Sequence, residues 1–255
     1  MPLDRYSGRL LVILLGLILL LVPVVSFAGP ARSSFAQGLQ ALQEGNPSLA
    51  VKKFSAVLKQ DPRWVEAYIN RGVAYRRLGK LKQALADFDQ ALKLAPQAME
   101  AYYNRGLIRS QLGQFAQAVE DYTRALRYDP KDWQTYYNRG NAYLELNRPR
   151  QALQDYDQAL KLNPGGSNIL HNRGLAHLMA GQPEKALKDF RRVLASTPFH
   201  ARAYFNQGKA LEALGRKTEA VRSYRKFLEV GDPTADKALM EQALQRLQTL
   251  EGQAG

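Results

Sequence analysis

Side chains that could carry out chemistry are few and widely spaced in this sequence. The three histidines, His171, His177 and His200, lack the spacing of metal ligands, and the chain contains no cysteine. The absence of cysteine excludes disulfides, thiolate zinc sites and cysteine nucleophiles. No phosphate-cradling glycine loop occurs either. The sequence therefore predicts a binding protein, with no cofactor, metal or small-molecule substrate, rather than an enzyme.

Asparagine, by contrast, recurs at a fixed interval of 34 residues, as Asn70, Asn104, Asn138, Asn172 and Asn206. A carboxamide both donates and accepts hydrogen bonds, so a row of them can pair with the backbone of an extended peptide regardless of its sequence. The bulky residues that precede the last four asparagines are Tyr103, Tyr137, His171 and Phe205. We expect these nine side chains to form a peptide-binding groove. The alternatives are that each asparagine bonds only to its own helices and that the bulky residues only pack between neighbouring repeats.

The elements that must position these residues follow the same period. Proline recurs every 34 residues at Pro62, Pro96, Pro130, Pro164 and Pro198. This spacing divides the chain into six repeats, numbered 1 to 6 below, at 31–64, 65–98, 99–132, 133–166, 167–200 and 201–234. Position 8 of every repeat is glycine, position 20 is alanine, position 24 is aromatic and position 28 is leucine. Such regularity indicates one helical unit repeated along the chain.

Each repeat is predicted to hold two short helices. The first carries apolar or small residues at positions 4, 8 and 11, which is helical spacing. It ends at position 15, where five repeats have glycine and repeat 4 has Asn147, the usual substitute in a left-handed helix end. The second helix spans about positions 17 to 30 and is closed by the proline at position 32. Glycine at position 8 would let the two helices approach closely against the aromatic residue at position 24.

This pattern, with Asn-Arg-Gly at 70–72, 104–106, 138–140 and 172–174, resembles the tetratricopeptide repeat family. The resemblance implies an all-α, right-handed solenoid of six helix-turn-helix repeats whose first helices line a concave groove. It also implies a capping helix within residues 235–255. Position 2 carries Glu66, Glu100 and Gln134 where the family's carboxylate clamp needs basic residues, which argues against chaperone binding of that type.

Arginine and aspartate also recur in step in repeats 2 to 5. Arginine stands at position 7, where the family usually has leucine, in Arg71, Arg105, Arg139 and Arg173, and aspartate stands at position 23, in Asp87, Asp121, Asp155 and Asp189. Positions 7 and 23 lie opposite each other in a hairpin that turns near position 16. We therefore predict one structural ion pair within each of these repeats.

Residues 1–30 differ from the rest of the chain. A head with Arg5 and Arg9 precedes an uninterrupted apolar run, Leu10 to Val22, which matches the apolar region of a secretory signal peptide. Extended to Ala28, the same segment is long enough for an uncleaved membrane anchor. The sequence leaves both alternatives open. Either one predicts that the repeats are exported across the inner or thylakoid membrane, to the periplasm or lumen.

The net charge of +13 bears on the choice of partner. Basic residues recur on the second helices, away from the expected groove. A protein or peptide partner in the groove is the first expectation. A scaffold that docks on an anionic membrane or acidic polymer through its basic convex face is the alternative. Nucleic acid is disfavoured, because export removes most of it and the aromatic residues are needed for the repeat core.

Overall fold

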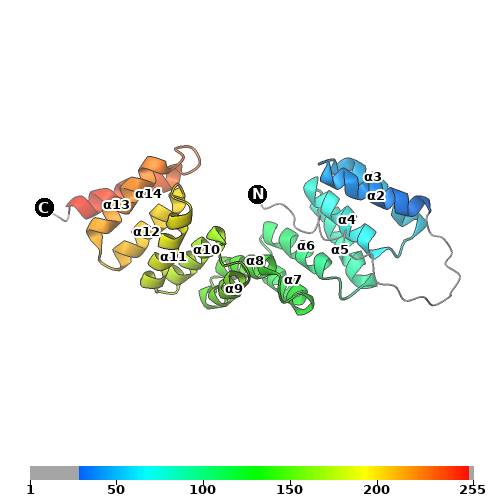
Figure 1. The fold of residues 1–255 in the computed structure, drawn as a ribbon, viewed down its shortest axis with the longest axis horizontal. Coiled ribbons are helices and arrows are strands. Elements are labelled where there is room, and N and C mark those ends of the chain that lie inside the picture. The colour runs from blue at the N-terminus through cyan, green and yellow to red at the C-terminus, as the bar shows by residue number, and fades with distance from the viewer. Residues whose placement is uncertain (1–28, 253–255) are drawn as a thin grey trace. The chain divides into compact units, whose positions relative to one another are not determined.

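The computed structural model describes residues 29–252, all of whose regular elements are helices. This confirms the all-α prediction. The helices are α2 to α14, and they fall into two compact units, Met1–Leu112 and Gly113–Gly255 (Figure 1). The predicted signal peptide or anchor lies outside the described residues. Among residues 29–252, no helix has the length and apolarity that crossing a bilayer requires.

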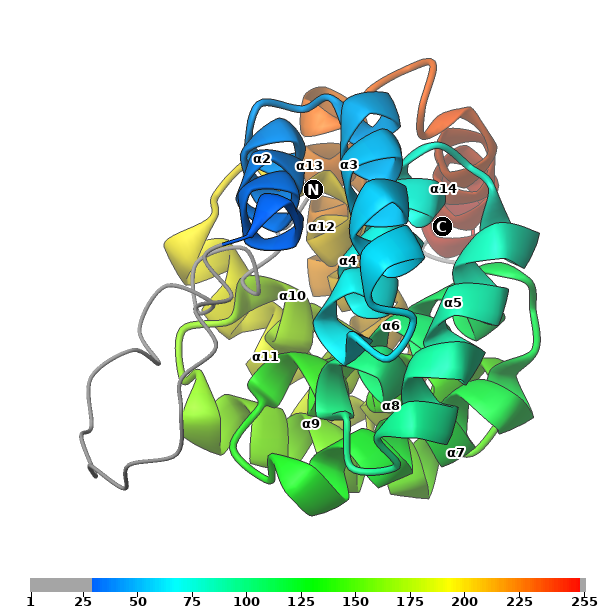
Figure 2. The same ribbon diagram turned by 90° about the vertical axis from the view of Figure 1, so that its right-hand side faces the viewer.

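The N-terminal unit contains α2 (Pro30–Gln43), α3 (Pro47–Gln60), α4 (Val65–Arg77), α5 (Leu81–Leu94) and α6 (Met99–Gln111). Each helix packs against the next one along the chain (Figures 1 and 2). Ala50 and Phe54 of α3 are fully buried at the centre of the first helix pairs. Phe35 of α2 stacks on Trp64, the residue just before α4, with a ring-centroid distance of 4.9 Å.

The C-terminal unit begins with α7 (Phe115–Tyr128), α8 (Trp133–Glu145), α9 (Pro149–Leu162) and α10 (Ser167–Met179). It continues with α11 (Pro183–Ser196), α12 (Ala201–Ala213), α13 (Lys217–Val230) and α14 (Lys237–Gly252). Ala243, Leu247 and Leu250 of α14 are buried in one cluster with Phe227 of α13. Helix α14 therefore covers apolar surface that the last repeat would otherwise expose to water.

The turn within each repeat has the predicted left-handed residue. The glycines at position 15 have φ between +69° and +73°, and Asn147 has φ of +55°. Asn147 and Arg148 donate backbone hydrogen bonds to the carbonyls of Leu144 and Tyr143, which satisfies the end of α8. The expectation that asparagine replaces glycine in repeat 4 is confirmed.

The glycine at position 8 is the point of closest approach between the paired helices. A Cβ atom on Gly174 would lie 2.6 Å from the ring of Phe190, and one on Gly140 would lie 2.7 Å from the ring of Tyr156. Gly38, Gly72 and Gly208 have the same relation to the aromatic residues of their own repeats. A side chain here would overlap the buried ring, so glycine sets the distance between the helices.

Three of the predicted arginine–aspartate pairs are confirmed. Arg71 donates from Nε and Nη2 to Asp87 at 2.8 and 2.7 Å, and Arg139 binds Asp155 with the same two distances. Arg173 binds Asp189 at 2.7 and 2.6 Å. The pair of Arg105 and Asp121 joins residues of different units and stays a prediction.

The same arginines also reach the preceding repeat. Their Nη1 atoms donate to position 25 of that repeat, in the pairs Arg71–Ser55, Arg105–Asp89, Arg139–Thr123 and Arg173–Asp157, at 2.6 to 3.1 Å. One guanidinium therefore links three helices, because its rigid fork offers donors in several directions. The hydrogen bonds to Asp189 raise the pKa of Arg173, and burial raises the pKa of Asp155. These partly buried pairs are structural.

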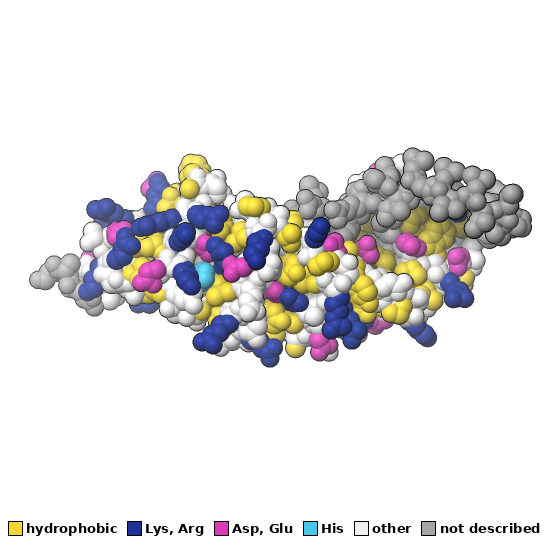
Figure 3. Space-filling view, turned by 60° about the horizontal axis from the view of Figure 1, so that its bottom comes forward, with side chains coloured by type: hydrophobic (Ala, Val, Ile, Leu, Met, Phe, Trp, Pro, Cys, Tyr) yellow, Lys and Arg dark blue, Asp and Glu magenta, His cyan; other side chains and the backbone are white. Residues whose placement is uncertain are grey.

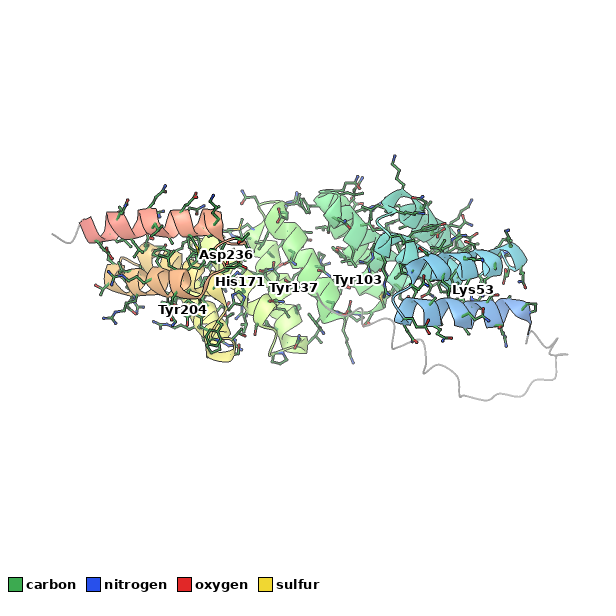
Figure 4. The ribbon with its side chains drawn as sticks, turned by 90° about the horizontal axis from the view of Figure 1, so that it is seen from above. Lys53, Tyr103, Tyr137, His171, Tyr204 and Asp236 are labelled. Carbon is green, nitrogen blue, oxygen red and sulfur yellow. The ribbon has the colours of Figure 1, made fainter. Side chains whose placement is uncertain are left out.

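The terminal repeats have a single hydrogen bond between the same two positions instead of an ion pair. In repeat 1, Lys53 Nζ donates to Gln37 Oε1 at 2.5 Å; Lys53 is labelled in Figure 4. In repeat 6, Ser223 Oγ donates to Gln207 Oε1 at 3.0 Å. The contact between positions 7 and 23 thus persists where the arginine–aspartate pair is absent.

Candidate functional site

The asparagines of the N-terminal unit are turned toward their own helices. Asn70 of α4 is buried, and its Nδ2 donates to the carbonyl of Glu66 at 2.7 Å. Asn104 of α6 is buried as well, and its Nδ2 donates to the carbonyl of Glu100 at 2.8 Å. The Oδ1 atom of Asn104 is buried and has no hydrogen-bond partner within residues 29–252. These two amides therefore use a donor on their own helices, as the alternative interpretation expects.

Asn172, in the C-terminal unit, is arranged differently. The residue lies on α10, and its Nδ2 donates to two side chains of the neighbouring helix α8: Tyr137 Oη at 3.1 Å and Asn141 Oδ1 at 2.8 Å. Asn141 Oδ1 also accepts from Tyr156 Oη of α9 at 2.7 Å. Both hydrogens of the Asn172 amide are thus used, which leaves Oδ1 as its remaining hydrogen-bonding atom.

Tyr156 is the buried end of this network. Its side chain is fully buried, and burial raises the pKa of its phenol, so the hydroxyl remains a neutral donor. A buried phenol needs an acceptor, and Asn141 supplies it. Repeat 6 solves the same problem differently, because Tyr224 Oη donates to Glu212 at 2.5 Å.

The sequence carried a signal for Asn141 that the period alone did not reveal. The repeats whose position 24 is phenylalanine have Leu39, Val73 and Leu175 at position 9. Repeat 4 has tyrosine at position 24 and asparagine at position 9. Repeat 3 combines Tyr122 with Leu107, so the signal is specific to repeat 4, where donor and acceptor occur together and the structure contains the hydrogen bond.

Three of the predicted bulky groove residues are mostly used in packing. Tyr103 is buried, and Phe205 is buried with its edge against the rings of Tyr224 and Phe227, at 5.7 and 5.3 Å. His171 stacks on His200 at a ring-centroid distance of 4.8 Å. Burial, together with the nearby His200 and Arg202, lowers the pKa of His171 to about 4.

Tyr137 is the exception among the bulky residues. It is half-buried, and its ring lies 6.1 Å from that of Tyr156 while its hydroxyl meets Asn172. Of the two remaining asparagines, Asn138 is half-buried and Asn206 is buried. Tyr137 and Asn172 are therefore two half-buried side chains that meet through a hydrogen bond on the first helices of the C-terminal unit.

Tyr137 and Asn172 belong to the face that the first helices of the C-terminal repeats form. Figure 4 labels Tyr137 on α8, His171 on α10 and Tyr204 on α12, with Asp236 in the turn before α14. Arg202 of α12 donates from Nε to the buried Asp236 at 2.9 Å. Within residues 29–252, no three or more His, Cys, Asp or Glu side chains are grouped so that they could hold a metal ion. The face consists of hydrogen-bonding and aromatic groups held by packed helices.

The fold is similar to those of several solved structures. YrrB, described as a TPR protein with an unusual peptide-binding site, is 24% identical with a TM-score of 0.68, covering 75% of this chain and 97% of YrrB. MamA is 23% identical with a TM-score of 0.61, covering 68% of this chain and 94% of MamA. A tetratricopeptide repeat protein from Parabacteroides merdae is 20% identical with a TM-score of 0.67, covering 88% of this chain and 93% of that protein.

No curated protein matches the chain. Family profiles do match it along most of the repeats. Profiles described as "Tetratricopeptide repeat" match residues 65–97, 133–165 and 171–236, and one described as "TPR repeat" matches residues 108–147. Together these segments cover well over half of the sequence. The chain therefore belongs to the tetratricopeptide repeat family.

Proposed function

We propose that this protein is a non-enzymatic interaction scaffold that binds an extended segment of a partner protein along the first-helix face of its C-terminal unit. The observation that carries the proposal is the joined pair of Tyr137 and Asn172. Tyr137 Oη accepts from Asn172, so its own hydrogen is available to donate. Asn172 Oδ1 is available to accept. One donor and one acceptor side by side match the C=O and N–H groups of a peptide backbone.

The network behind this pair supports the proposal. Asn141 and Tyr156 hold the Asn172 amide in one orientation through bonds of 2.8 and 2.7 Å. A side chain that is already ordered loses little conformational entropy when a ligand binds. The pair thus has the preorganisation expected of a recognition site. The solved fold of YrrB, whose description mentions a peptide-binding site, is in keeping with this use.

The location of the scaffold is part of the proposal. We infer from the basic head and the apolar run Leu10–Val22 that the repeats act on the exported side of a membrane. Labelling a single introduced cysteine in intact cells with a membrane-impermeant reagent tests this. An introduced cysteine at Ser48 should react without permeabilisation, and a requirement for permeabilisation contradicts export.

Selection from a random peptide library against the full chain provides the ligand for a test of the site. Asn172→Ala should weaken a selected peptide by about tenfold, because it removes the acceptor and frees Tyr137. Tyr137→Phe should weaken it by a similar factor. The matched control is Asn70→Ala, which alters the same repeat position where the amide bonds to its own helix. Equal affinity for wild type and both C-terminal variants rejects the site.

A further inference from the structure

The outer surface of α3 and α5 in the N-terminal unit carries four exposed lysines. Lys52 and Lys59 of α3 are seven residues apart, and Lys82 and Lys93 of α5 are eleven apart, so each pair lies on one face of its helix. All four side chains are exposed. None of the four has a hydrogen bond or an ion pair in the described part of the chain. We call these four residues the lysine face.

The acidic residues of these helices do not offset this charge. Helix α3 contains no aspartate or glutamate, and α5 contains only Asp87 and Asp89. Asp87 is buried against Arg71, and Asp89 forms an ion pair of 2.6 Å with Arg105. Each carboxylate therefore has an arginine partner, and the lysines retain their full charge.

Arg71 of the intervening helix α4 links the two helices. Arg71 donates to Ser55 of α3 at 3.1 Å and to Asp87 of α5 at 2.7 Å, so a single side chain spans from one helix to the other. Small side chains lie between the lysines at Ser48, Ala56 and Ala86, and the longer exposed side chains are those of Gln60, Gln83 and Asp89. Small residues between the lysines allow a flat, charged surface to approach closely.

We propose that the lysine face docks the N-terminal unit on a bilayer that contains anionic phospholipids. Charge complementarity supports this occupant, since basic groups close to an anionic lipid surface are attracted to it. The aromatic residues Phe54 and Phe88 of these helices are fully buried, so the face has no ring on which a nucleic-acid base can stack. The bilayer is therefore favoured over a single-stranded nucleic acid.

The position of this unit in the chain points the same way. The apolar run Leu10–Val22 ends eight residues before Pro30, where α2 begins. Eight extended residues reach at most about 28 Å. An inserted apolar run would therefore keep the start of α2, and with it the N-terminal unit, close to the lipid headgroups.

The outer surface of the C-terminal unit differs. Its second helices carry Glu120, Glu184 and Glu229 at the repeat positions that Lys52, Lys82 and Lys59 occupy in the N-terminal unit. Magenta side chains lie among the dark blue ones on the face of the molecule shown in Figure 3. A surface of mixed sign is attracted less strongly to a uniformly negative bilayer. Docking is therefore assigned to the N-terminal unit.

Flotation of the full chain with vesicles tests the proposal. Vesicles of phosphatidylcholine alone are compared with vesicles that contain about 30 mol% phosphatidylglycerol. The apolar run is present in every variant and meets both lipids, so the ratio of binding to the two kinds of vesicle reports the electrostatic part. Wild type should prefer the anionic vesicles by about tenfold or more at low salt and lose this preference at high salt.

The quadruple variant K52E/K59E/K82E/K93E should lose the preference, and the neutral variant K52Q/K59Q/K82Q/K93Q should lose most of it. The matched control is K131E/K161E/K185E/K188E, which makes the same change in net charge at four exposed lysines of the C-terminal unit. It should retain the preference to within about threefold. Circular dichroism establishes that each variant is folded.

Three outcomes would overturn the proposal. The first is a wild type with equal binding to both kinds of vesicle. The second is an equal loss in the lysine-face variant and its control, which would mean that net charge alone is read. The third is displacement of the wild type from anionic vesicles by duplex DNA at equal phosphate concentration, which would assign the face to nucleic acid.

Discussion

The two units contain the same repeat but use its asparagine differently. In the N-terminal unit, Asn70 and Asn104 are buried and donate to carbonyls of their own helices. In the C-terminal unit, Asn172 donates to side chains of the preceding repeat and keeps its oxygen available. The neighbours make the difference, because Tyr137 and Asn141 offer Asn172 two acceptors outside its own helix. The position in the repeat thus fixes the place of a side chain on its helix, and the residues of the adjoining repeat determine which hydrogen bonds it forms.

The outer surfaces also differ between the units. Helices α3 and α5 expose four lysines, unpaired within residues 29–252, and one carboxylate, Asp89, which is paired with Arg105, whereas the second helices of the C-terminal unit carry glutamates at three of the corresponding lysine positions. With the hydrogen-bonding pair on one unit and the lysine face on the other, the chain separates the two proposed tasks, partner recognition and membrane docking. The four predictions below examine this contrast through stability, beginning with the largest expected effect.

The largest loss of stability is expected when a partly buried arginine of the C-terminal unit is replaced. Arg173→Leu leaves two carboxylates, Asp189 and Asp157, without their partner, whereas Arg71→Leu leaves Asp87 and the neutral Ser55. We expect a loss of about 3–5 kcal/mol in unfolding free energy for Arg173→Leu and a smaller loss for Arg71→Leu. Urea denaturation measures both. An equal or larger loss for Arg71→Leu would show that Asp157 adds nothing.

Acid should weaken the C-terminal unit through His171. The pKa of this residue is about 4 in the folded protein and near 6.5 when unfolded, so the unfolded chain binds the proton more readily. Stability should therefore fall as pH decreases from 6.5 to 4, by a total on the order of 3 kcal/mol, and His171 should contribute no further change below pH 4.

His171→Phe is the control, since repeats 1 and 6 have phenylalanine at this position. The difference in urea midpoint between pH 7 and pH 4.5 should shrink in this variant. An unchanged difference would assign the acid sensitivity to other groups. All three histidines of the chain lie in the C-terminal unit, so the N-terminal unit should lack this component.

The network in repeat 4 should be convertible to the apolar form found in repeat 1. Asn141→Leu leaves the buried hydroxyl of Tyr156 without its acceptor and should cost about 1–3 kcal/mol. Adding Tyr156→Phe recreates the Leu39–Phe54 combination and should recover most of the loss. A double-mutant cycle by thermal denaturation measures the coupling. Additive losses would mean that the hydrogen bond contributes little.

The left-handed turn in repeat 4 should show the smallest effect. Asn147 has φ of +55°, a conformation that an alanine adopts at a cost of about 1 kcal/mol. Asn147→Ala should therefore lower stability by about that amount, while Asn147→Gly should be close to neutral and make the turn equivalent to those at Gly45 and Gly79. Thermal denaturation measures the stability of the two variants. An alanine variant more stable than the wild type would contradict the left-handed conformation at this position.

Features that arise within one repeat were predictable from the sequence. The turn at position 15, the contact of Gly174 with Phe190 and the pairing of Arg71 with Asp87 all join residues at most 16 positions apart. Each depends on local sterics or on facing positions of one hairpin, which the period of 34 residues repeats along the chain. The helix pairs and their apolar faces follow for the same reason.

The accessible hydrogen-bonding groups could not be read from the repeat in the same way. Asn70 and Asn172 occupy the same position, yet the first bonds to Glu66 four residues away and the second to Tyr137 and Asn141, 35 and 31 residues away. An amide takes whichever partners its surroundings offer, and those surroundings belong to the neighbouring repeat. The sequence by itself determined the helical units and their internal contacts. Only the packing of one repeat on the next decided which amide faces a partner, because that choice depends on distances between helices.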